Sequence, residues 1–233
     1  VAGRMSVQVG ANLLLKYHGG EGILLSGVPG VLPAEVVIVG GGVVGTNAAK
    51  IASGMGAHVT IMDIDRNRLA YIDYIFGGKV STLIYNELNI AEIVKKADLL
   101  IGAVLVAGAK APKTVSEEMV KSMKKGSVIV DVAIDQGGSI ATIDRATTHD
   151  NPSYEKYGVI HYSVANMPGA VPRTSTYSLA AATLPYILKI ANKGVKNALL
   201  DDNSLLHGLN TYNGNVTYKA VADNLNKEYV APK

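Results

Sequence analysis

Short apolar runs alternate with segments of helical periodicity through the first two thirds of the chain. The apolar runs occupy residues 35–40, 57–63, 79–85, 97–105, 127–134 and 158–166. The segments between them, such as 65–77 with Leu69, Tyr71, Ile72 and Ile75, place apolar side chains along one helix face. Strands that alternate with helices form βαβ units, so the pattern predicts an α/β protein with a doubly wound, mostly parallel sheet.

The pattern changes after residue 170, where strands are no longer expected. Residues 173–194 predict one long helix, and shorter helices are expected around 203–208 and 216–226. Thr174, Ser175 and Thr176 are candidate N-caps of the long helix. Pro185 is expected to kink the helix or to mark a first turn, and Gly194 is expected to end it. We therefore expect a sheet domain over residues 1–170 and, over 171–233, a helical segment that belongs to a second, incomplete domain.

The chain also opens with helical spacing, at Val1, Met5, Val9 and Leu13. It has no initiator methionine, no charged leader and no signal-peptide core at this end. The segment reads as the middle of a helix whose start has been removed, in preference to an amphipathic N-terminal helix left after methionine cleavage. We expect this helix to connect an earlier segment to the sheet domain.

Composition argues against several classes of protein. The hydrophobic fraction is 48%, enough for a full core, and there is no uninterrupted apolar run of the roughly 18 residues that span a bilayer. The net charge is only +3 and the lysines and arginines are scattered, which argues against a nucleic-acid partner. Cysteine is absent and the five histidines are far apart, so no metal site is expected. These features are typical of a soluble cytoplasmic protein.

Three glycines directly follow the first strand of the predicted sheet. Gly40, Gly42 and Gly45 have the spacing G-x-G-x-x-G and open a helix. In the Rossmann fold the first glycine turns the chain, the second lets backbone approach a pyrophosphate, and the third packs helix against strand. Asp63 ends the next strand, about 20 residues on, where a carboxylate binds the adenosine ribose. These residues predict a dinucleotide site, against the alternative that the glycines serve packing and Asp63 caps the following helix.

The same carboxylate discriminates between the two nicotinamide dinucleotides. It would repel a 2′-phosphate, so the sequence predicts NAD as the cofactor rather than NADP. Arg66 and Arg68 are close in sequence and blur this preference. Arg68 either stacks on the adenine or is a solvated helix residue, and both interpretations stay open.

A second carboxylate follows a later strand, in VDVAIDQGG at residues 130–138. Asp135 stands where a hydrophobic strand breaks into a loop with two glycines, which leave the backbone free to turn and a ligand free to approach. Ligands bind beyond the carboxyl ends of the strands in doubly wound sheets, so this position indicates that Asp135 takes part in the reaction at the ligand site. The alternative is that Asp135 only forms the turn. Asp131, inside the same strand, is expected to be a structural acid bonded to nearby backbone or side chains.

Several longer strings resemble one family. VAGRMSVQVGA (1–11), GAVLVAGAKAPKTV (102–115), VDVAIDQGG (130–138), TTHDNP (147–152) and VANMPGAVPRTSTY (164–177) are similar to the NAD-binding portion of bacterial alanine dehydrogenase. The similarity runs nearly end to end. It implies reversible oxidative deamination of L-alanine to pyruvate and ammonia with NAD, in a protein that is commonly a hexamer. It also implies that Val104 falls in the loop along the dinucleotide.

The resemblance implies roles for other single residues. Asp135 matches the active-site aspartate beside the nicotinamide, and Asn166 and Met167 match residues at the nicotinamide end of the cofactor. Asp63 matches the adenosine-ribose acid, and Arg68 matches the neighbouring basic position. The family's substrate-carboxylate anchor and its acid/base histidine lie upstream of the segment that VAGRMSVQVG resembles, so neither is expected among these residues.

Two other functions stay open. The chain would also suit the NAD(H)-binding component of a nicotinamide nucleotide transhydrogenase, a related protein with a similar domain. It would equally suit an NAD-binding module without catalysis, since the upstream substrate segment is not among these residues. A transhydrogenase component binds NADH without alanine-dependent reduction, and a module gives no turnover when an upstream segment is restored.

Overall fold

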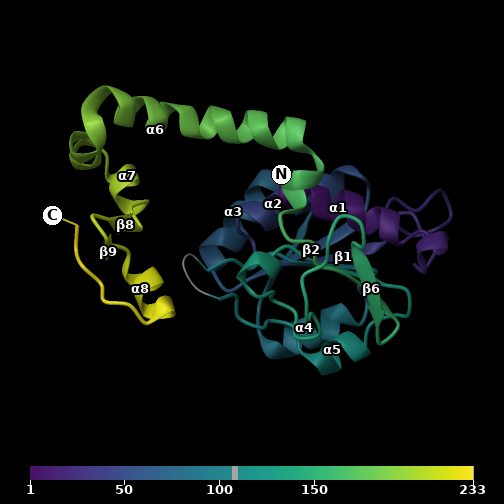
Figure 1. Ribbon diagram of the computed structural model, residues 1–233. Helices are drawn as coiled ribbons and strands as arrows, with labels where there is room; N and C mark the ends of the chain where they lie inside the picture. Colours follow the sequence, from purple (N-terminus) through teal and green to yellow (C-terminus); the bar gives the residue numbers. More distant parts are fainter. Residues whose placement is uncertain (107–109, 233) are drawn as a thin grey trace. The chain divides into compact units, whose positions relative to one another are not determined.

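A seven-stranded sheet forms the centre of the N-terminal part of the molecule in the computed structural model, which describes residues 1–106 and 110–232 (Figure 1). Its strands are β1 (Glu35–Val39), β2 (His58–Asp63), β3 (Ser81–Ile84), β4 (Leu99–Gly102), β5 (Val128–Asp131), β6 (Ser153–Lys156) and β7 (Val159–Tyr162). They are arranged in the order β3-β2-β1-β4-β5-β7-β6, and neighbouring strands are parallel except β6 and β7. The predicted doubly wound, mostly parallel α/β fold is confirmed.

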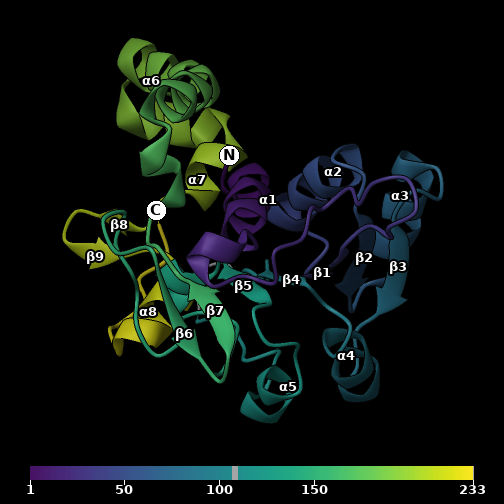
Figure 2. The ribbon, with the colours of Figure 1, turned by 90° about the vertical axis from the view of Figure 1, so that its right-hand side faces the viewer.

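Helices cover both faces of this sheet (Figure 2). One face carries α1 (Ala2–Leu13), α2 (Val43–Gly54) and α3 (Arg66–Phe76), and the other carries α4 (Glu87–Val94) and α5 (Glu117–Lys121). Short 3-10 helices are η1 (Lys16–His18), η2 (Ile134–Gln136) and η3 (Met167–Ala170). Alternate side chains of a strand point to opposite faces, and Val39 packs in the same core as Ile90 and Val94 of α4. Burial on both faces explains why the central strands read as continuous apolar runs.

The sheet and its helices make up one of two compact units, which comprises Val1–Leu105 and Lys110–Ala170. Three details of this unit differ from the prediction. The segment between the apolar runs 97–105 and 127–134 is α-helical only over the five residues of α5. In α3, Leu69 and Ile72 are buried but Tyr71 and Ile75 are exposed, so the buried stripe is narrower than expected. The antiparallel edge strand β6 was not predicted, because its residues SYEK show no apolar alternation.

The second unit, from Val171 onward, is mainly helical. Its elements are α6 (Pro172–Asp201), α7 (Asn203–His207), β8 (Thr211–Tyr212), β9 (Asn215–Val216) and α8 (Lys219–Leu225). The three helices agree with the predicted helical segments. The hairpin of β8 and β9 was not predicted, since two-residue strands leave no periodic pattern.

The predicted caps of α6 are wrong. The helix begins at Pro172, with Val171 as its N-cap and no capping side chain. Thr174, Ser175 and Thr176 therefore lie inside the first turns of the helix. The Ser175 hydroxyl donates back to the Val171 carbonyl oxygen at 3.1 Å, which is the bond of a helical serine rather than of a cap. The first-turn proline is Pro172, where its fixed φ suits the start of a helix.

The break in α6 also differs from expectation. Pro185 keeps helical backbone angles, and the residue with non-helical angles is Gly194, at φ 74° and ψ 158°. Gly194 interrupts the helix as predicted for a glycine with positive φ, but helical geometry resumes beyond it and continues to Asp201. Gly194 is therefore a kink and not a stop.

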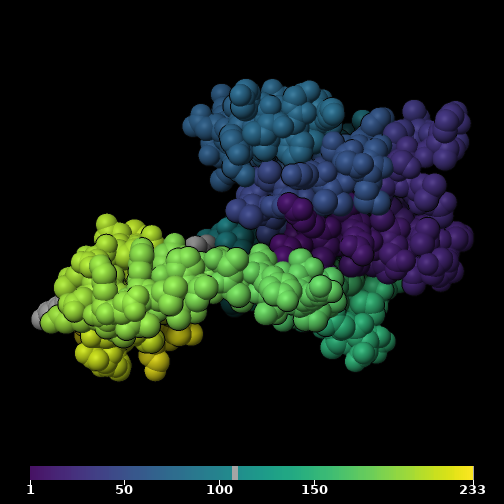
Figure 3. Space-filling view, turned by 90° about the horizontal axis from the view of Figure 1, so that it is seen from above, coloured from purple at the N-terminus to yellow at the C-terminus, as the bar shows by residue number. Residues whose placement is uncertain are grey.

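The second unit buries few apolar side chains. Tyr177, Leu179 and Ile187 of α6 are 71%, 65% and 56% exposed. Figure 3 shows the helix in green with uncovered side chains along its visible face.

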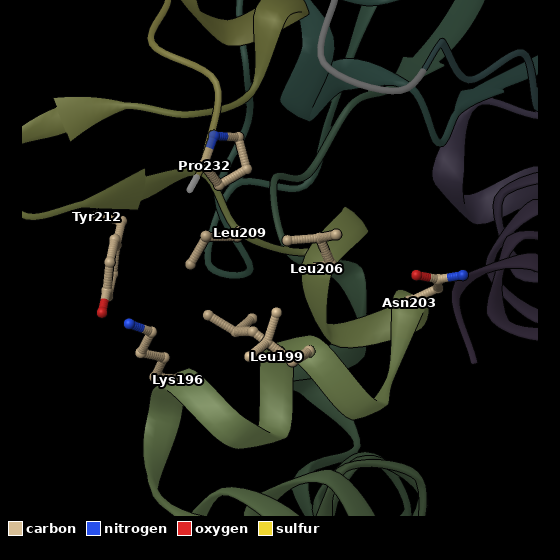
Figure 4. Close-up of a pocket in the computed structure, with 8 residues that line it drawn as sticks. Lys196, Leu199, Asn203, Leu206, Leu209, Tyr212 and Pro232 are labelled. Atoms are coloured by element: carbon tan, nitrogen blue, oxygen red, sulfur yellow. The ribbon is translucent and has the colours of Figure 1, made fainter.

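A hollow of about 140 Å³ lies within this unit. The residues that line it are drawn as sticks in Figure 4 and are Lys196, Leu199, Leu200, Asn203, Leu206, Leu209, Tyr212 and Pro232. This hollow is mainly apolar, and none of the predicted cofactor residues lines it.

Within residues 1–106 and 110–232, no helix combines the length and the apolar character needed to cross a lipid bilayer.

Candidate functional site

The carboxyl ends of β1, β4 and β5 are level with one another. Val39 pairs in register with Gly102, and Gly102 pairs with Asp131. The next strand follows closely, since Val130 pairs with Tyr162 of β7. The loops after these four strands therefore leave the same edge of the sheet. β1 and β4 are neighbours although β2 and β3 separate them in sequence, and such a switch point is where doubly wound folds bind ligands.

The glycine loop between β1 and α2 brings backbone segments close together and leaves space at the helix N-terminus. Gly40 has φ +107°, and a Cβ there would come within 2.7 Å of the Ala103 carbonyl oxygen. A Cβ at Gly45 would lie 1.8 Å from the Gly40 carbonyl oxygen. Gly42 is the N-cap of α2 with no capping side chain, and a Cβ there would meet no heavy atom within 4 Å. The first-turn N–H groups of α2 are thus open to an anion, and the loop fits a pyrophosphate.

Asp63 holds the glycine loop from the end of β2. Its Oδ2 accepts a hydrogen bond from the Gly41 N–H at 2.6 Å, and its Oδ1 accepts one from the Asp65 N–H at 2.9 Å. The cap of α3 is Asp65 itself, whose side chain accepts from the Asn67 N–H. Asp63 is therefore not the helix cap, which removes the structural alternative considered for it. Its carboxylate lies beside the glycine loop, as an acid that binds a ribose must.

Arg68 is tied to the same loop. Its Nε donates to the Gly41 carbonyl oxygen at 2.5 Å, and its Nη2 donates to Thr46 Oγ1 at 2.8 Å. The guanidinium carbon also lies 4.9 Å from the centre of the Tyr71 ring. Arg68 is thus not a solvated helix residue, because the Gly41 carbonyl oxygen and the Thr46 hydroxyl both bond to its guanidinium. Its position beside the predicted ribose acid is consistent with a place next to the adenosine.

Three further predicted residues lie on the loops after β4 and β7. Val104 is partly buried against the core that contains Ile90 and Val94 of α4, and a Cβ built on Gly40 would lie 3.0 Å from its backbone nitrogen. Asn166 has φ +54°, a conformation that asparagine tolerates better than most residues, and its carbonyl oxygen accepts from Gly169 at 2.8 Å. Met167 opens η3 and is buried. The structure therefore brings Val104 to the glycine loop and sets Asn166 at a tight turn.

Asp135 projects from the loop after β5. It lies in η2, which ends at Gly137 with φ +88° and is followed by Gly138 with φ +74°. The side chain is exposed, and no hydrogen bond or ion pair to its carboxylate forms among the described residues. Asp135 is therefore not a turn-forming Asp, since such a residue bonds its own backbone. A carboxylate to which no described residue bonds is available to a ligand.

Asp131 is the structural acid that the sequence predicted. It is fully buried. Its Oδ1 accepts from the Ala133 N–H and the Ser139 hydroxyl, and its Oδ2 accepts from the N–H groups of Ser139 and Ile140. Burial raises the pKa of the Asp131 carboxyl above its ordinary range, and these donors oppose the rise.

Two residues at the site were missed by sequence reasoning. Thr46 links Arg68 to the glycine loop, because its hydroxyl also donates to the Gly42 carbonyl oxygen at 2.8 Å. Lys113, on the loop after β4, donates to backbone carbonyls of the Asp135 loop. Neither residue stands in a pattern that marks it, since the partners of each are fixed only by the fold. No group of residues suited to bind a metal occurs in the part of the chain that the structure describes.

Comparison with known proteins gives a consistent result. The family model "Alanine dehydrogenase/PNT, C-terminal domain" matches residues 6–219. The alanine dehydrogenase of Methanococcus maripaludis is 72% identical over 222 residues, which are 95% of this chain and 60% of that protein. A solved L-alanine dehydrogenase has a TM-score of 0.89 and 52% identity, over 97% of this chain and 62% of that one.

A transhydrogenase is a more distant match. The solved transhydrogenase from Sinorhizobium meliloti has a TM-score of 0.62 and 26% identity, over 76% of this chain and 50% of that one. The chain spans about 60% of the length of the alanine dehydrogenases that it matches. Whatever the remaining length contributes to those proteins has no counterpart among these residues.

Proposed function

Because this chain belongs to the alanine dehydrogenase/PNT family, with residues 6–219 matching the C-terminal domain, we propose that it is the NAD-binding part of an L-alanine dehydrogenase. The family and the Rossmann-type sheet indicate a nicotinamide cofactor, and NAD is our specific proposal. The observation that carries it is a pair of carboxylates at one edge of the sheet. Asp63 ends β2 and Asp135 follows β5, on opposite sides of the switch point between β1 and β4.

The two ends of the cofactor would meet different residues. Gly40, Gly42 and Gly45 would receive the pyrophosphate at the N-terminus of α2, where the open N–H groups favour an anion. Asp63 would accept the adenosine ribose hydroxyls and disfavour a 2′-phosphate. Arg68 would lie beside the adenosine.

Asn166 and Met167 would contact the nicotinamide end. Val104 would lie along the middle of the dinucleotide, since its backbone is next to Gly40. Val104 follows β4, at the switch point, and Asn166 and Met167 follow β7, which is separated from β4 by β5.

Asp135 would act on the substrate. NAD, if bound here, would supply the acceptor for the hydride that leaves the Cα of L-alanine, and water would then hydrolyse the resulting imine to pyruvate and ammonia. The Asp135 carboxylate would orient the substrate ammonium and stabilise the positive charge that develops on its nitrogen. Because no described residue bonds to the carboxylate, its charge is available to that nitrogen.

The second unit would belong to the substrate domain. Large apolar side chains of α6, among them Tyr177 and Ile187, are exposed, which is costly for a unit that stands alone. We infer that residues 171–233 return from the cofactor domain into a substrate domain completed by upstream residues. We further propose a cytoplasmic homo-oligomer, a hexamer by family resemblance.

The test is alanine-dependent reduction of NAD by the complete gene product. Formation of NADH on addition of L-alanine, and its reversal by pyruvate with ammonia, is the expected result. A complete protein that binds NADH but shows no alanine-dependent reduction would favour the transhydrogenase component instead. Nucleotide binding without any turnover would favour a non-catalytic module. The identity of 72% to an alanine dehydrogenase, against 26% to a transhydrogenase, supports the first outcome.

A further inference from the structure

The Asp135 carboxylate has no bonding partner among the described residues, neither a side chain nor a backbone group. Within this part of the chain, its place depends on the backbone that carries it. The loop that carries it ends in Gly137 and Gly138, two residues with positive φ and the widest conformational freedom. Such a loop needs other contacts to keep one conformation.

Asp131 supplies one of these contacts from inside the protein. It accepts hydrogen bonds from the Ala133 N–H, at the start of the loop, and from the N–H groups of Ser139 and Ile140, at its end, at 3.0, 2.6 and 3.0 Å. A single buried carboxylate therefore joins both ends of the loop. Among the described residues, none of the hydrogen bonds to Asp131 comes from residues 134–138, between these ends.

Lys113 supplies the second contact, to the glycines in the middle of the loop. Its Nζ donates to the carbonyl oxygens of Gly137 at 2.8 Å, Gly138 at 2.9 Å and Ile140 at 3.2 Å. An ammonium group has three N–H donors, so these bonds use its full capacity. None of the ion pairs between described residues includes Lys113. Three carbonyl oxygens that converge on one point repel each other unless a cation lies there.

The segment around Lys113 is itself anchored to the same loop. The Ala111 N–H donates to the Gln136 carbonyl oxygen at 3.0 Å, and the Thr114 N–H donates to that of Ser139 at 2.8 Å. The backbone of Lys113 thus lies between two fixed points. The bonds between its ammonium and the glycine carbonyl oxygens restrict the side chain to fewer conformations than a long surface lysine usually has.

We propose that Lys113 is a positioning residue for Asp135: its ammonium fixes the two glycines after η2 and so holds the Asp135 carboxylate at the place where the substrate nitrogen reacts. Lys113 acts with Asp131, which fixes the ends of the loop from inside. This inference rests on the proposed function for the role of Asp135. The bracing of the loop does not rest on it.

Amide hydrogen exchange tests the bracing in the complete gene product. Lys113→Met removes the ammonium, and Lys125→Met is the matched control, because Lys125 is exposed and precedes β5 at the opposite edge of the sheet. We expect the amides of residues 136–140 to exchange at least about tenfold faster in the Lys113 variant only. Lys113→Arg, which keeps the charge, should restore most of the protection. Unchanged exchange in Lys113→Met overturns the proposal.

A double-mutant cycle tests whether the bracing acts through Asp135. Misplacing a reacting group by about 1 Å can cost up to 10²-fold in rate, so Lys113→Met should lower kcat by roughly 10-fold to 100-fold with NADH affinity within about threefold of wild type. In an Asp135→Asn background the same change should have little further effect. An equal loss of kcat in both backgrounds means that Lys113 acts independently of Asp135, and contradicts the proposal.

The two experiments separate this inference from the proposed function. If the wild-type gene product reduces no NAD with L-alanine, the proposed function has failed, and that failure is visible without any variant. The exchange experiment then decides the bracing in either direction, because it needs no turnover.

Discussion

Asp131 and Asp135 are four residues apart, and the fold places them in opposite surroundings. Asp131 is fully buried and accepts four hydrogen bonds, so its oxygens are occupied. Asp135 is exposed and accepts none from the described residues. A carboxylate whose oxygens are all used stabilises the fold, and one whose oxygens are free can bind a ligand. This difference is the physical reason for proposing a catalytic role for Asp135 and not for Asp131.

We expect Asp135→Asn to reduce kcat of the complete gene product by about 10² to 10³-fold, with NAD affinity nearly unchanged. The amide keeps the size of the side chain but loses the charge that stabilises a developing cation, and one preorganised electrostatic contact is typically worth this much. Steady-state kinetics, NAD titration and thermal melting on one preparation provide the check. Near-normal kcat with a lowered melting temperature would return Asp135 to a purely structural role.

Asp63→Ala tests the preference between the two dinucleotides. The change removes the predicted ribose contact and the repulsion of a 2′-phosphate, so NAD affinity should fall while the ratio of NADP to NAD affinity rises. The matched control is Asp65→Ala, which removes the cap of α3 at a cost of about 1 kcal/mol in stability but leaves the ratio unchanged. Calorimetric titration with both nucleotides measures the effect. Equal or tighter binding of NADP by the wild-type protein would contradict the argument.

The place of a single residue in the fold could be predicted where the signal is local, while the functional roles of these residues stay predictions. The glycine spacing and the carboxylate at a strand end are visible within a few positions, because backbone geometry at one turn demands them. Arg68 was placed next to the cofactor site but with two open interpretations, since its partners Gly41 and Thr46 lie 27 and 22 residues away. Lys113 was not singled out for the same reason: its carbonyl partners are 24 to 27 residues distant.

At the scale of elements, burial on two faces made the sheet readable. β1, β2 and β4 appear as apolar runs because helices cover them from both sides. The edge strand β6 and the two-residue strands β8 and β9 were missed because their residues need no such pattern. The N-cap of α6 was misplaced because three hydroxyl residues resemble caps, whereas Pro172 opens the helix two to four residues before them.

The contact between β1 and α2 gives a prediction with a control in the same helix. Gly45→Ala puts a Cβ 1.8 Å from the Gly40 carbonyl oxygen, so the glycine loop must shift, and NAD affinity should fall at least tenfold. Gly54→Ala, in the last turn of α2, meets no atom within 4 Å and should stabilise the protein by about 0.4–1 kcal/mol with unchanged NAD affinity. Thermal melting and NAD titration compare the two. Normal NAD binding by Gly45→Ala would show that this contact is not needed.

The pairing of β6 with β7 buries a histidine and makes stability depend on pH. His161 bonds to Thr142 at 2.8 Å and to the Val159 carbonyl oxygen at 2.9 Å, and burial lowers the pKa of its imidazole. A lowered folded pKa means that the unfolded chain binds the proton more tightly. The contribution of His161 to the free energy of unfolding should therefore be constant above about pH 6.5. Below that pH the free energy of unfolding should fall as the pH falls.

Denaturant titration between pH 5 and 8 checks this dependence on pH. His161→Gln should flatten the curve by up to about 1.4 kcal/mol per pH unit, the limit for one proton. His58→Gln serves as the control, because His58 is exposed on β2. Equal slopes in the wild type and in His161→Gln would exclude His161 as the source.

At the scale of the whole molecule, the two units differ in how they could be stable. The first has a continuous core from β1, β4 and β5 to α4 and α5. In the second, the buried side chains are few, with Ala198 and Ala222 among them, while most large apolar residues of α6 are exposed. The sequence indicated a helical segment but not which of its faces is covered, because the apolar positions of α6 do not by themselves show what packs against them.

We expect a preparation consisting of these 233 residues alone to show little or no alanine dehydrogenase activity. The chain spans about 60% of the length of the alanine dehydrogenases it matches, and the family's substrate-carboxylate anchor and acid/base histidine are expected upstream. Without an anchor the substrate is not oriented against the cofactor, and orientation alone can be worth about 7–11 kcal/mol of the barrier. NAD binding should persist, because Gly40, Gly42, Gly45 and Asp63 all lie in the first unit. Alanine-dependent NADH formation by a preparation whose intact mass equals this chain would overturn the assignment of the anchor to upstream residues, and loss of NAD binding would show that the first unit needs those residues to fold.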